Sequence, residues 1–151
     1  MKINILSIGK FKDVNCENLF LEYKKRTNFD VNLKELVLKK NFVGEKLKQE
    51  EGKLLLQNVN NGSKIIVLDE RGKIITTNEF CELITKYQNN SVGEVSFIIG
   101  GSDGLSQEVR DKADFVLSFG KMVFPHLFVR VMLVEQLYRV YTLQNGHPYH
   151  K

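Results

Sequence analysis

Short apolar runs alternate with segments of helical spacing along the whole chain, and this alternation restricts the possible folds more than any other feature. Strand-like runs cover residues 3–8, 31–38, 65–68, 95–99 and 115–118. Helical spacing covers residues 17–25 and 42–59 and begins again near Thr76, Ser106 and Pro125. Regular alternation of this kind predicts one α/β domain over residues 1–151, a mostly parallel sheet covered by helices on both faces.

Two of the strand-like runs, residues 65–68 and 95–99, are apolar throughout, which is typical of strands buried on both faces. The polar residues 69–72 then predict a turn that closes the first of these strands. Thr76 and Glu79 stand three apart before an apolar periodic segment, and this spacing predicts a capping box at the start of a helix.

Composition excludes several classes of protein. With 42% hydrophobic and 26% charged residues among 151, the chain has enough apolar side chains for a core and is not disordered. No apolar run approaches the roughly 20 residues that span a bilayer, and the start shows no signal-peptide pattern. Cys16 and Cys81 lie far apart and near no histidine, which predicts no metal site and a reducing compartment. We therefore expect a cytoplasmic protein without a metal.

Positive charge is concentrated in the first part of the chain. Residues 1–64 carry 13 Lys and Arg against 8 Asp and Glu, whereas the rest of the chain is close to neutral. A basic lobe favours nucleic acid as a partner. A lysine-rich solvated surface explains the same charge, so both interpretations stay open at this point.

Three predicted strand ends offer places for a ligand, because open α/β sheets bind ligands beyond the carboxyl ends of their strands. They are Leu68 with the polar residues after it, the glycine-rich residues 100–104, and residues 119–124. The glycines match neither the dinucleotide fingerprint nor a phosphate-binding P-loop. A ligand cradle and a plain tight turn are therefore both possible for residues 100–104.

The segment 127–143 after Pro125 is apolar almost all round. Its polar interruptions are Arg130, Glu135, Gln136, Arg139 and Thr142. A helix without a polar face must be covered on more than one side, which favours a homodimer over burial within one monomer. Glu135 and Arg139 have the i,i+4 spacing of a helix-stabilising ion pair.

All three histidines follow the last strand-like run. His126 stands at the predicted helix start and either faces a ligand or caps the preceding loop, and His147 fits an exposed loop. The chain then ends in Tyr149, His150 and Lys151 after a rigid proline. Such a tail can stack on a base and contact phosphate, or it can simply pack against the domain.

Several motifs together resemble a known family. They are residues 97–105 (FIIGGSDGL), Pro125 with His126, Arg130, residues 135–139 (EQLYR) and residues 148–150 (PYH). In this order they resemble ribosomal RNA large subunit methyltransferase H, a family of the SPOUT superfamily, and the resemblance extends over the whole chain.

The resemblance implies a C-terminal trefoil knot, a homodimer, and methylation of N3 of a pseudouridine in large-subunit (23S) ribosomal RNA on assembled ribosomes. It implies S-adenosyl-L-methionine as cofactor, held by Leu68, Gly100, Phe119, Gly120, Lys121, Met122, Val123 and Phe124. Phe119 and Gly120 depart from the small polar residues that the family is expected to have there.

By the same resemblance, Tyr149 and His150 of the partner subunit place the substrate and Arg139 orients the site, while no residue is assigned as general base. Two other functions stay possible: a non-catalytic ribosome-associated RNA-binding protein, and an enzyme of another kind that uses a nucleotide cofactor.

Overall fold

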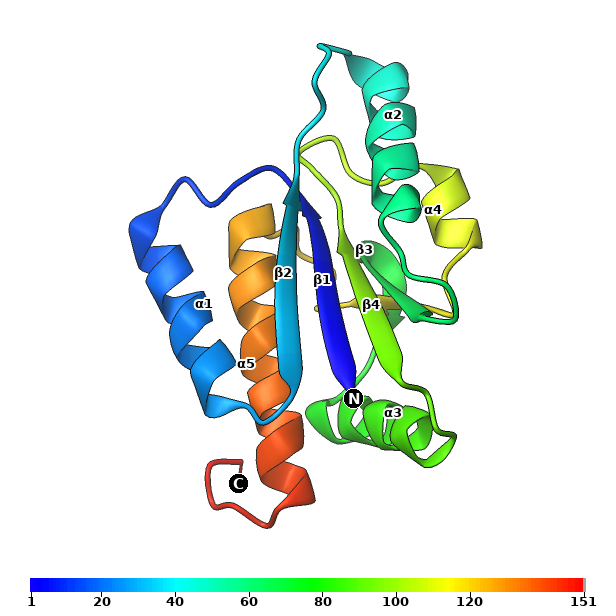
Figure 1. Cartoon of the computed structure of the whole chain (residues 1–151). Helices are drawn as coiled ribbons and strands as arrows, with labels where there is room; N and C mark the ends of the chain where they lie inside the picture. Colours follow the sequence, from blue (N-terminus) through cyan, green and yellow to red (C-terminus); the bar gives the residue numbers. More distant parts are fainter. Residues whose placement is uncertain (151) are drawn as a thin grey trace.

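The computed structural model describes residues 1–150, which form a five-stranded parallel sheet in the order β2-β1-β4-β3-β5 (Figure 1). The strands are β1 (Lys2–Ile8), β2 (Asp30–Leu36), β3 (Lys64–Ile74), β4 (Glu94–Ile99) and β5 (Phe115–Ser118). All five were expected from the apolar runs, and the parallel sheet is confirmed. Since every strand points the same way, all five carboxyl ends lie at one edge of the sheet, the upper edge in Figure 1.

Helices cover both faces of the sheet, as predicted. The chain forms α1 (Val14–Arg26), α2 (Gly44–Gln57), α3 (Thr77–Asn89), α4 (Gln107–Asp111) and α5 (His126–Gln144). Side chains of α1, α3 and α5 share one hydrophobic core with the sheet, and those of α2 and α4 share a second core on the opposite face. Residues 3 and 5 of β1 face the first core while 6 and 8 face the second, which is the two-residue period of a strand buried on both sides.

Local signals fixed several helix starts. The backbone N–H of Glu79 donates to the Thr76 hydroxyl at 3.2 Å, and the backbone N–H of Thr76 donates to the Glu79 carboxylate at 2.7 Å. This reciprocal pair is the predicted capping box. Asp13 and Ser106 cap α1 and α4 by accepting backbone N–H groups with their side-chain oxygens, without the reciprocal bond of a capping box.

The predicted turn at residues 69–72 is wrong, because β3 continues through this polar segment to Ile74. Leu68 and Lys73 both pair with Leu117 of β5, so the residues between them form a wide bulge. A Cβ on Gly72 would lie 2.7 Å from the Val116 carbonyl oxygen, so glycine allows the two backbones to approach there. Hydrogen bonds of the strand ladder resume after the bulge, and the polar run therefore does not end the strand.

Helix α5 is largely covered within its own chain. The buried residues of this helix are Arg130, Leu133, Val134, Leu137, Tyr138, Val140 and Thr142. The alternative of burial within one monomer thus accounts for most of the apolar pattern. One face of α5 points outward. It carries Phe128, which is 52% exposed, and Met132, which belongs to neither hydrophobic core. The homodimer and the trefoil knot stay predictions.

Candidate functional site

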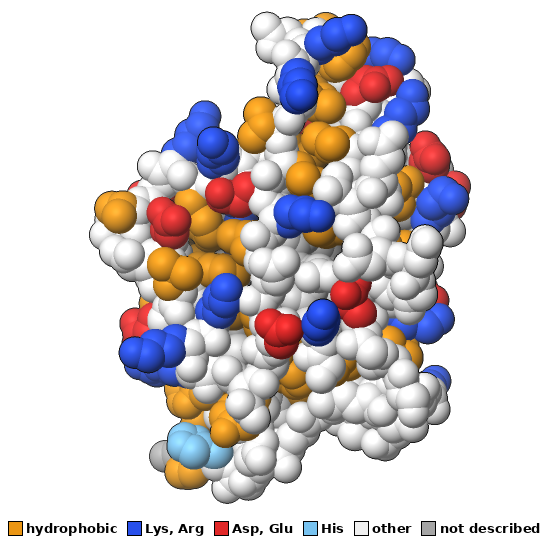
Figure 2. All heavy atoms as spheres, viewed as in Figure 1, with side chains coloured by type: hydrophobic (Ala, Val, Ile, Leu, Met, Phe, Trp, Pro, Cys, Tyr) orange, Lys and Arg blue, Asp and Glu red, His pale blue; other side chains and the backbone are white. Residues whose placement is uncertain are grey.

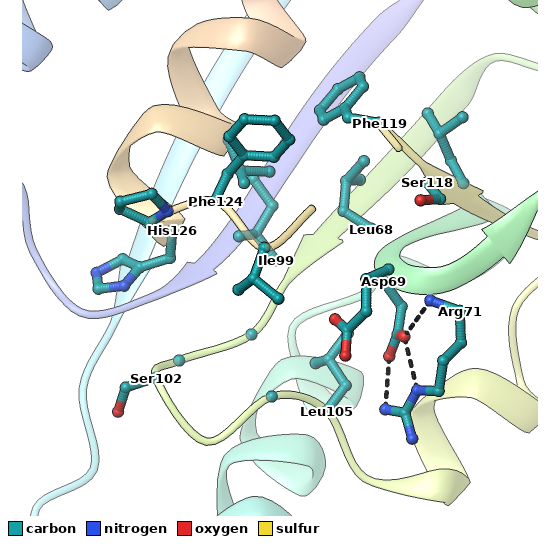
Figure 3. A pocket seen from close by; sticks show the side chains of 18 of the residues that line it. Leu68, Asp69, Arg71, Ile99, Ser102, Leu105, Ser118, Phe119, Phe124 and His126 are labelled. Carbon is teal, nitrogen blue, oxygen red and sulfur yellow. Dashed lines mark hydrogen bonds and ion pairs between the residues drawn. The ribbon is translucent and has the colours of Figure 1, made fainter. Parts of the chain in front are cut away.

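A cavity of about 690 Å³ lies at the carboxyl edge of the sheet, between the ends of β3, β4 and β5 and the start of α5 (Figure 3). This is the edge at which parallel α/β sheets bind ligands. Its volume lies within the roughly 300–1,000 Å³ that is typical of small-molecule sites. The three strand ends chosen from the sequence therefore converge on one cavity.

Seven of the eight predicted cofactor residues line this cavity. They are Leu68, Gly100, Phe119, Gly120, Met122, Val123 and Phe124. Lys121 is exposed in the same segment and is not part of the cavity wall. Leu68 and Ile99 form an apolar wall with Phe119 and Phe124, whose rings are seen on one side of the cavity in Figure 3.

The glycines of the site differ in what they do. A Cβ on Gly100 would lie 2.9 Å from the Leu105 side chain, so the lack of a side chain at Gly100 serves packing within the loop. Gly104 and Gly120 instead have φ angles of +81° and +139°, and a Cβ at either would meet nothing within 4 Å. These two positions leave main chain open beside the cavity, which suits close approach by a ligand.

One carboxylate of the cavity wall, that of Asp69, is held by two arginines. Arg71 donates to it at 2.9 Å and Arg110 at 3.3 Å, as the dashed lines in Figure 3 show for Arg71. Burial raises the pKa of Asp69, but the arginine hydrogen bonds and charges outweigh burial and hold the pKa below its usual range. Asp69 is therefore ionised and fully paired.

His126 is one of the residues that line the same cavity, and whether its imidazole faces a ligand stays a prediction. A Cβ on Gly9 would lie 3.8 Å from His126 Nε2 and 3.9 Å from an Arg130 nitrogen, so both side chains flank the turn after β1. Burial lowers the pKa of His126, and the charges of Arg130 and Lys12 lower it further.

Arg130 is fully buried, a role that sequence reasoning missed. Its guanidinium donates to the carbonyl oxygens of Ile8 at 2.7 Å and Gly9 at 2.9 Å and pairs with Glu35 at 3.2 Å. It also lies over the Phe11 ring, 4.9 Å from the centroid. An arginine within an almost wholly apolar helical segment was the available signal. Its partners come from β1 and β2, and residue spacing within α5 cannot identify them.

The three predicted catalytic residues form one cluster at the far end of α5. Arg139 donates to Glu135 at 2.7 Å, the expected i,i+4 pair, and lies 3.1 Å from Nδ1 of His150. The Tyr149 hydroxyl donates to the same Glu135 oxygen at 3.1 Å, and its ring lies under the Arg139 guanidinium. Tyr149, His150, Arg139 and Glu135 are hereafter the tail cluster.

The tail cluster and the cavity lie at opposite ends of α5. At 1.5 Å per residue the 19 residues of α5 span about 28 Å, and Figure 1 shows the C-terminus at the edge of the sheet opposite the carboxyl ends of the strands. The structure thus brings seven of the predicted cofactor residues together and the predicted catalytic residues together, but it does not join the two groups within one chain.

Other site types are absent from the described part of the chain. No group of three or more His, Cys, Asp and Glu within residues 1–150 is placed to hold a metal ion. None of the helices described there is long and apolar enough to cross a membrane. The cavity is therefore the best-defined candidate for the functional site.

The chain is thus an α/β protein with a parallel sheet and a glycine-lined cavity of small-molecule size at the carboxyl edge of that sheet. The chain belongs to the SPOUT methyltransferase family: the family described as "Predicted SPOUT methyltransferase" matches residues 1–150. The chain is 38% identical over 151 residues to "Ribosomal RNA large subunit methyltransferase H" of Rhodospirillum centenum, and the alignment covers 100% of this chain and 99% of that protein.

Two solved structures show the same fold at low sequence identity. A probable methyltransferase from Bordetella pertussis is similar with a TM-score of 0.60 and 10% identity, covering 93% of this chain and 96% of that chain. A putative methyltransferase from Legionella pneumophila, described as a complex with bound cofactor SAM, is similar with a TM-score of 0.50 and 11% identity, covering 92% of this chain and 66% of that chain.

Proposed function

We propose that this protein uses S-adenosyl-L-methionine to methylate N3 of a pseudouridine in 23S ribosomal RNA, acting on assembled ribosomes. One observation carries the proposal: the residues that the family resemblance assigns to the cofactor converge on a single cavity. The name of the full-length relative, which specifies large-subunit ribosomal RNA, supports the substrate.

The cavity fits such a cofactor in size and chemistry. Apolar side chains from three strand ends suit contact with an adenine ring. The missing side chains at Gly104 and Gly120 leave room for a ligand beside the main chain, although the N–H groups of both glycines are already bonded to Gly101 and Ser118. When bound, the cofactor supplies a methyl group that its sulfonium has already activated. The protein's own task is then to hold the target nitrogen in line with that methyl group and to remove its proton.

A homodimer would join the two separated halves of the site. The outward face of α5 carries Phe128 and Met132 near the cavity and the Glu135–Arg139 pair near the tail. In a two-fold symmetric dimer the same face of α5 from each protomer forms the contact. If the two α5 helices run in opposite directions across it, the tail cluster of one protomer lies beside the cavity of its partner. We include the C-terminal knot of the family in this proposal.

Hydrogen bonds within the tail cluster determine what it can offer a base. Arg139 is always protonated and donates, so Nδ1 of His150 accepts and the other ring nitrogen of a neutral His150 carries the proton. Tyr149 donates to Glu135, and hydrogen bonding with Tyr23, burial and the Glu135 charge all raise its pKa. The cluster thus presents donors and an aromatic ring, which suits binding of uracil-type carbonyl oxygens and stacking.

Exposed lysines lie at the same edge of the sheet as the cavity and fit an RNA backbone. Lys10 and Lys12 follow β1, and Lys39 and Lys40 follow β2, so all four lie at the carboxyl edge of the sheet. None of them forms an ion pair within residues 1–150. Figure 2 shows Lys and Arg side chains gathered at this upper end of the molecule. Free lysines of this kind contact phosphates.

The test combines binding with methyl transfer. The pure protein is titrated with S-adenosyl-L-methionine by calorimetry, and labelled methyl incorporation is then followed into ribosomes that lack the modification. One cofactor site and one methyl group on a 23S pseudouridine N3 are expected. Cofactor binding without transfer, or binding of ribosomes without cofactor binding, would contradict the proposal, and the second result would favour the non-catalytic RNA-binding protein.

A further inference from the structure

The group that accepts the proton of the target nitrogen is not identified by the family resemblance, and the structure narrows the choice. N3 of a uracil-type base carries a hydrogen that must leave before or as the methyl group arrives. The acceptor must lie at the cavity or come to it with the tail cluster. It must also be unprotonated at neutral pH and free of a strong hydrogen bond to its acceptor atom.

The tail cluster offers no free acceptor. Nδ1 of His150 already accepts from Arg139, and Tyr149 holds its proton because its pKa is raised. One carboxylate oxygen of Glu135 accepts from both Arg139 and Tyr149, and the other accepts from Gln136 at 2.9 Å. Each acceptor atom of the tail cluster therefore already accepts at least one hydrogen bond or belongs to a group that is itself a donor.

The carboxylates of the cavity wall are also poor acceptors. Asp69 is paired with two arginines, and this pairing lowers its pKa. Glu70 and Asp103 also line the cavity but are exposed to solvent. Water stabilises an exposed carboxylate as the anion, so it is a weaker proton acceptor than a neutral imidazole.

His126 remains, and its position meets the requirements. It is the first residue of α5, its imidazole lines the cavity, and no hydrogen bond within residues 1–150 engages the ring. Two charged groups act on it directly, and three more lie on the elements around the cavity. They are Arg130 on α5, Lys12 on the β1–α1 loop, Glu35 on β2 through Arg130, and, on the cavity wall, Lys48 of α2 and Asp103 of the glycine-rich loop.

We propose that His126 is the catalytic base that takes the N3 proton of the target pseudouridine, an inference that rests on the proposed function. The unprotonated ring nitrogen of His126 forms a bond to the N3 hydrogen, and the N3 electron pair forms the bond to the methyl carbon. The pair of the broken carbon–sulfur bond stays on sulfur, which becomes a neutral thioether. The imidazolium then returns its proton to solvent.

The surroundings keep this imidazole in its basic form. Burial lowers the pKa of His126, and the positive charges of Arg130 and Lys12 lower it further. A lowered pKa means that the neutral ring predominates at pH 7. The imidazolium formed during the reaction is close to Arg130, so it is unstable there and loses its proton readily.

The test uses full-length His126→Asn and His126→Gln with Phe119→Ala as a contrasting variant. Single-turnover methylation of ribosomes is measured between pH 5.5 and 9, cofactor affinity by calorimetry, and the His126 titration in the free protein by NMR. Wild type should lose rate toward acid pH with the same apparent pKa as the NMR signal, below 6.5. Both His126 variants should be at least about 100-fold slower, lack this acid limb, and bind cofactor within about twofold of wild type.

Phe119→Ala should show the opposite pattern, with weaker cofactor binding and an unchanged acid limb. An acid limb that persists in His126→Asn, or a rate within tenfold of wild type, would overturn the assignment to His126. Parallel loss of cofactor affinity in both His126 variants would also overturn it, because His126 would then be a cofactor residue. Absence of methylation by wild type would instead refute the proposed function, so the two failures are distinguishable.

Discussion

The guanidinium of Arg130 lies 3.2 Å from the Glu35 carboxylate, although 95 residues separate them in the sequence. Arg130 is fully buried and also donates to the carbonyl oxygens of Ile8 and Gly9. One side chain thus ties the first turn of α5 to the ends of β1 and β2. Because His126 lies one helical turn before Arg130, this network also sets the position of the cavity wall that carries the imidazole.

Replacing Arg130 by Met should lower the free energy of unfolding by about 3–5 kcal/mol. The substitution leaves two carbonyl oxygens and the Glu35 carboxylate without their buried donor, and methionine fills only part of the volume. Urea unfolding at pH 7 measures the change. Arg26→Met serves as control because Arg26 pairs with Glu22 at the surface, where an ion pair contributes at most about 1 kcal/mol. Equal effects of the two substitutions would show that the Arg130 network is not a stabilising element.

Glu51→Gln should raise the free energy of unfolding above that of wild type at pH 8, and this gain should be larger at pH 8 than at pH 4. Glu51 is buried, one of its carboxylate oxygens has no hydrogen-bond partner within residues 1–150, and burial and the nearby Asp103 charge raise its pKa. A raised folded-state pKa favours folding below the unfolded-state value of about 4.3, and this advantage is lost as the pH rises through the folded-state pKa. Glutamine does not ionise and removes that loss. Urea unfolding of both proteins at the two pH values tests this, and a variant less stable at pH 8 than wild type would contradict it.

Local patterns determined most of what the sequence could predict. The capping box of Thr76 and Glu79 and the apolar runs of β3 and β4 are complete within a few residues, so their spacing was enough. The three strand ends could be assigned to one site because parallel strands must end at the same edge.

Features that depend on distant partners escaped sequence reasoning. The bulge after Leu68 depends on Gly72 packing against the β5 backbone, and the burial of Arg130 depends on carbonyl oxygens of β1. The sequence pattern of α5 suggested that a second subunit covers one side of this helix, whereas α1 and α3 share a core with it within the chain. Hydrophobic periodicity shows that a helix is buried, but it does not show which helices become its neighbours.

Phe128→Glu should weaken a homodimer without unfolding the protomer. Phe128 is 52% exposed on the outward face of α5 and belongs to neither hydrophobic core, so a charge there is solvated in the monomer and costly in an apolar contact. Sedimentation at micromolar concentration should give about twice 17.4 kDa for wild type and a smaller weight-average mass for the variant. A wild-type protein that is monomeric and fully active would refute both the dimer and the shared active site.

Removal of residues 149–151 should abolish methylation and leave cofactor affinity within about twofold. The deletion takes Tyr149 and His150 from the tail cluster; Lys151 lies outside the described residues. These groups are assigned to the RNA base, whereas the cofactor residues lie at the other end of α5. Calorimetry and methyl incorporation are measured on the same preparation. Equal losses of binding and of activity would show that the tail supports the cofactor site or the fold.

Whole ribosomes should be methylated efficiently and the isolated RNA hairpin poorly. The net charge is only +4, and the free lysines at the carboxyl edge of the sheet include Lys10, Lys12, Lys39 and Lys40. Each phosphate contact adds to affinity and to its salt dependence, so a handful of contacts cannot hold a flexible RNA tightly at physiological salt. Recognition then requires a surface of fixed shape that presents the loop base to the cavity. Methyl incorporation from labelled cofactor into the two substrates, at matched salt, is the measurement. Lys39→Glu combined with Lys40→Glu should reduce the rate on ribosomes and flatten its salt dependence while leaving cofactor affinity unchanged. Equal rates on the bare hairpin would show that the loop alone carries recognition.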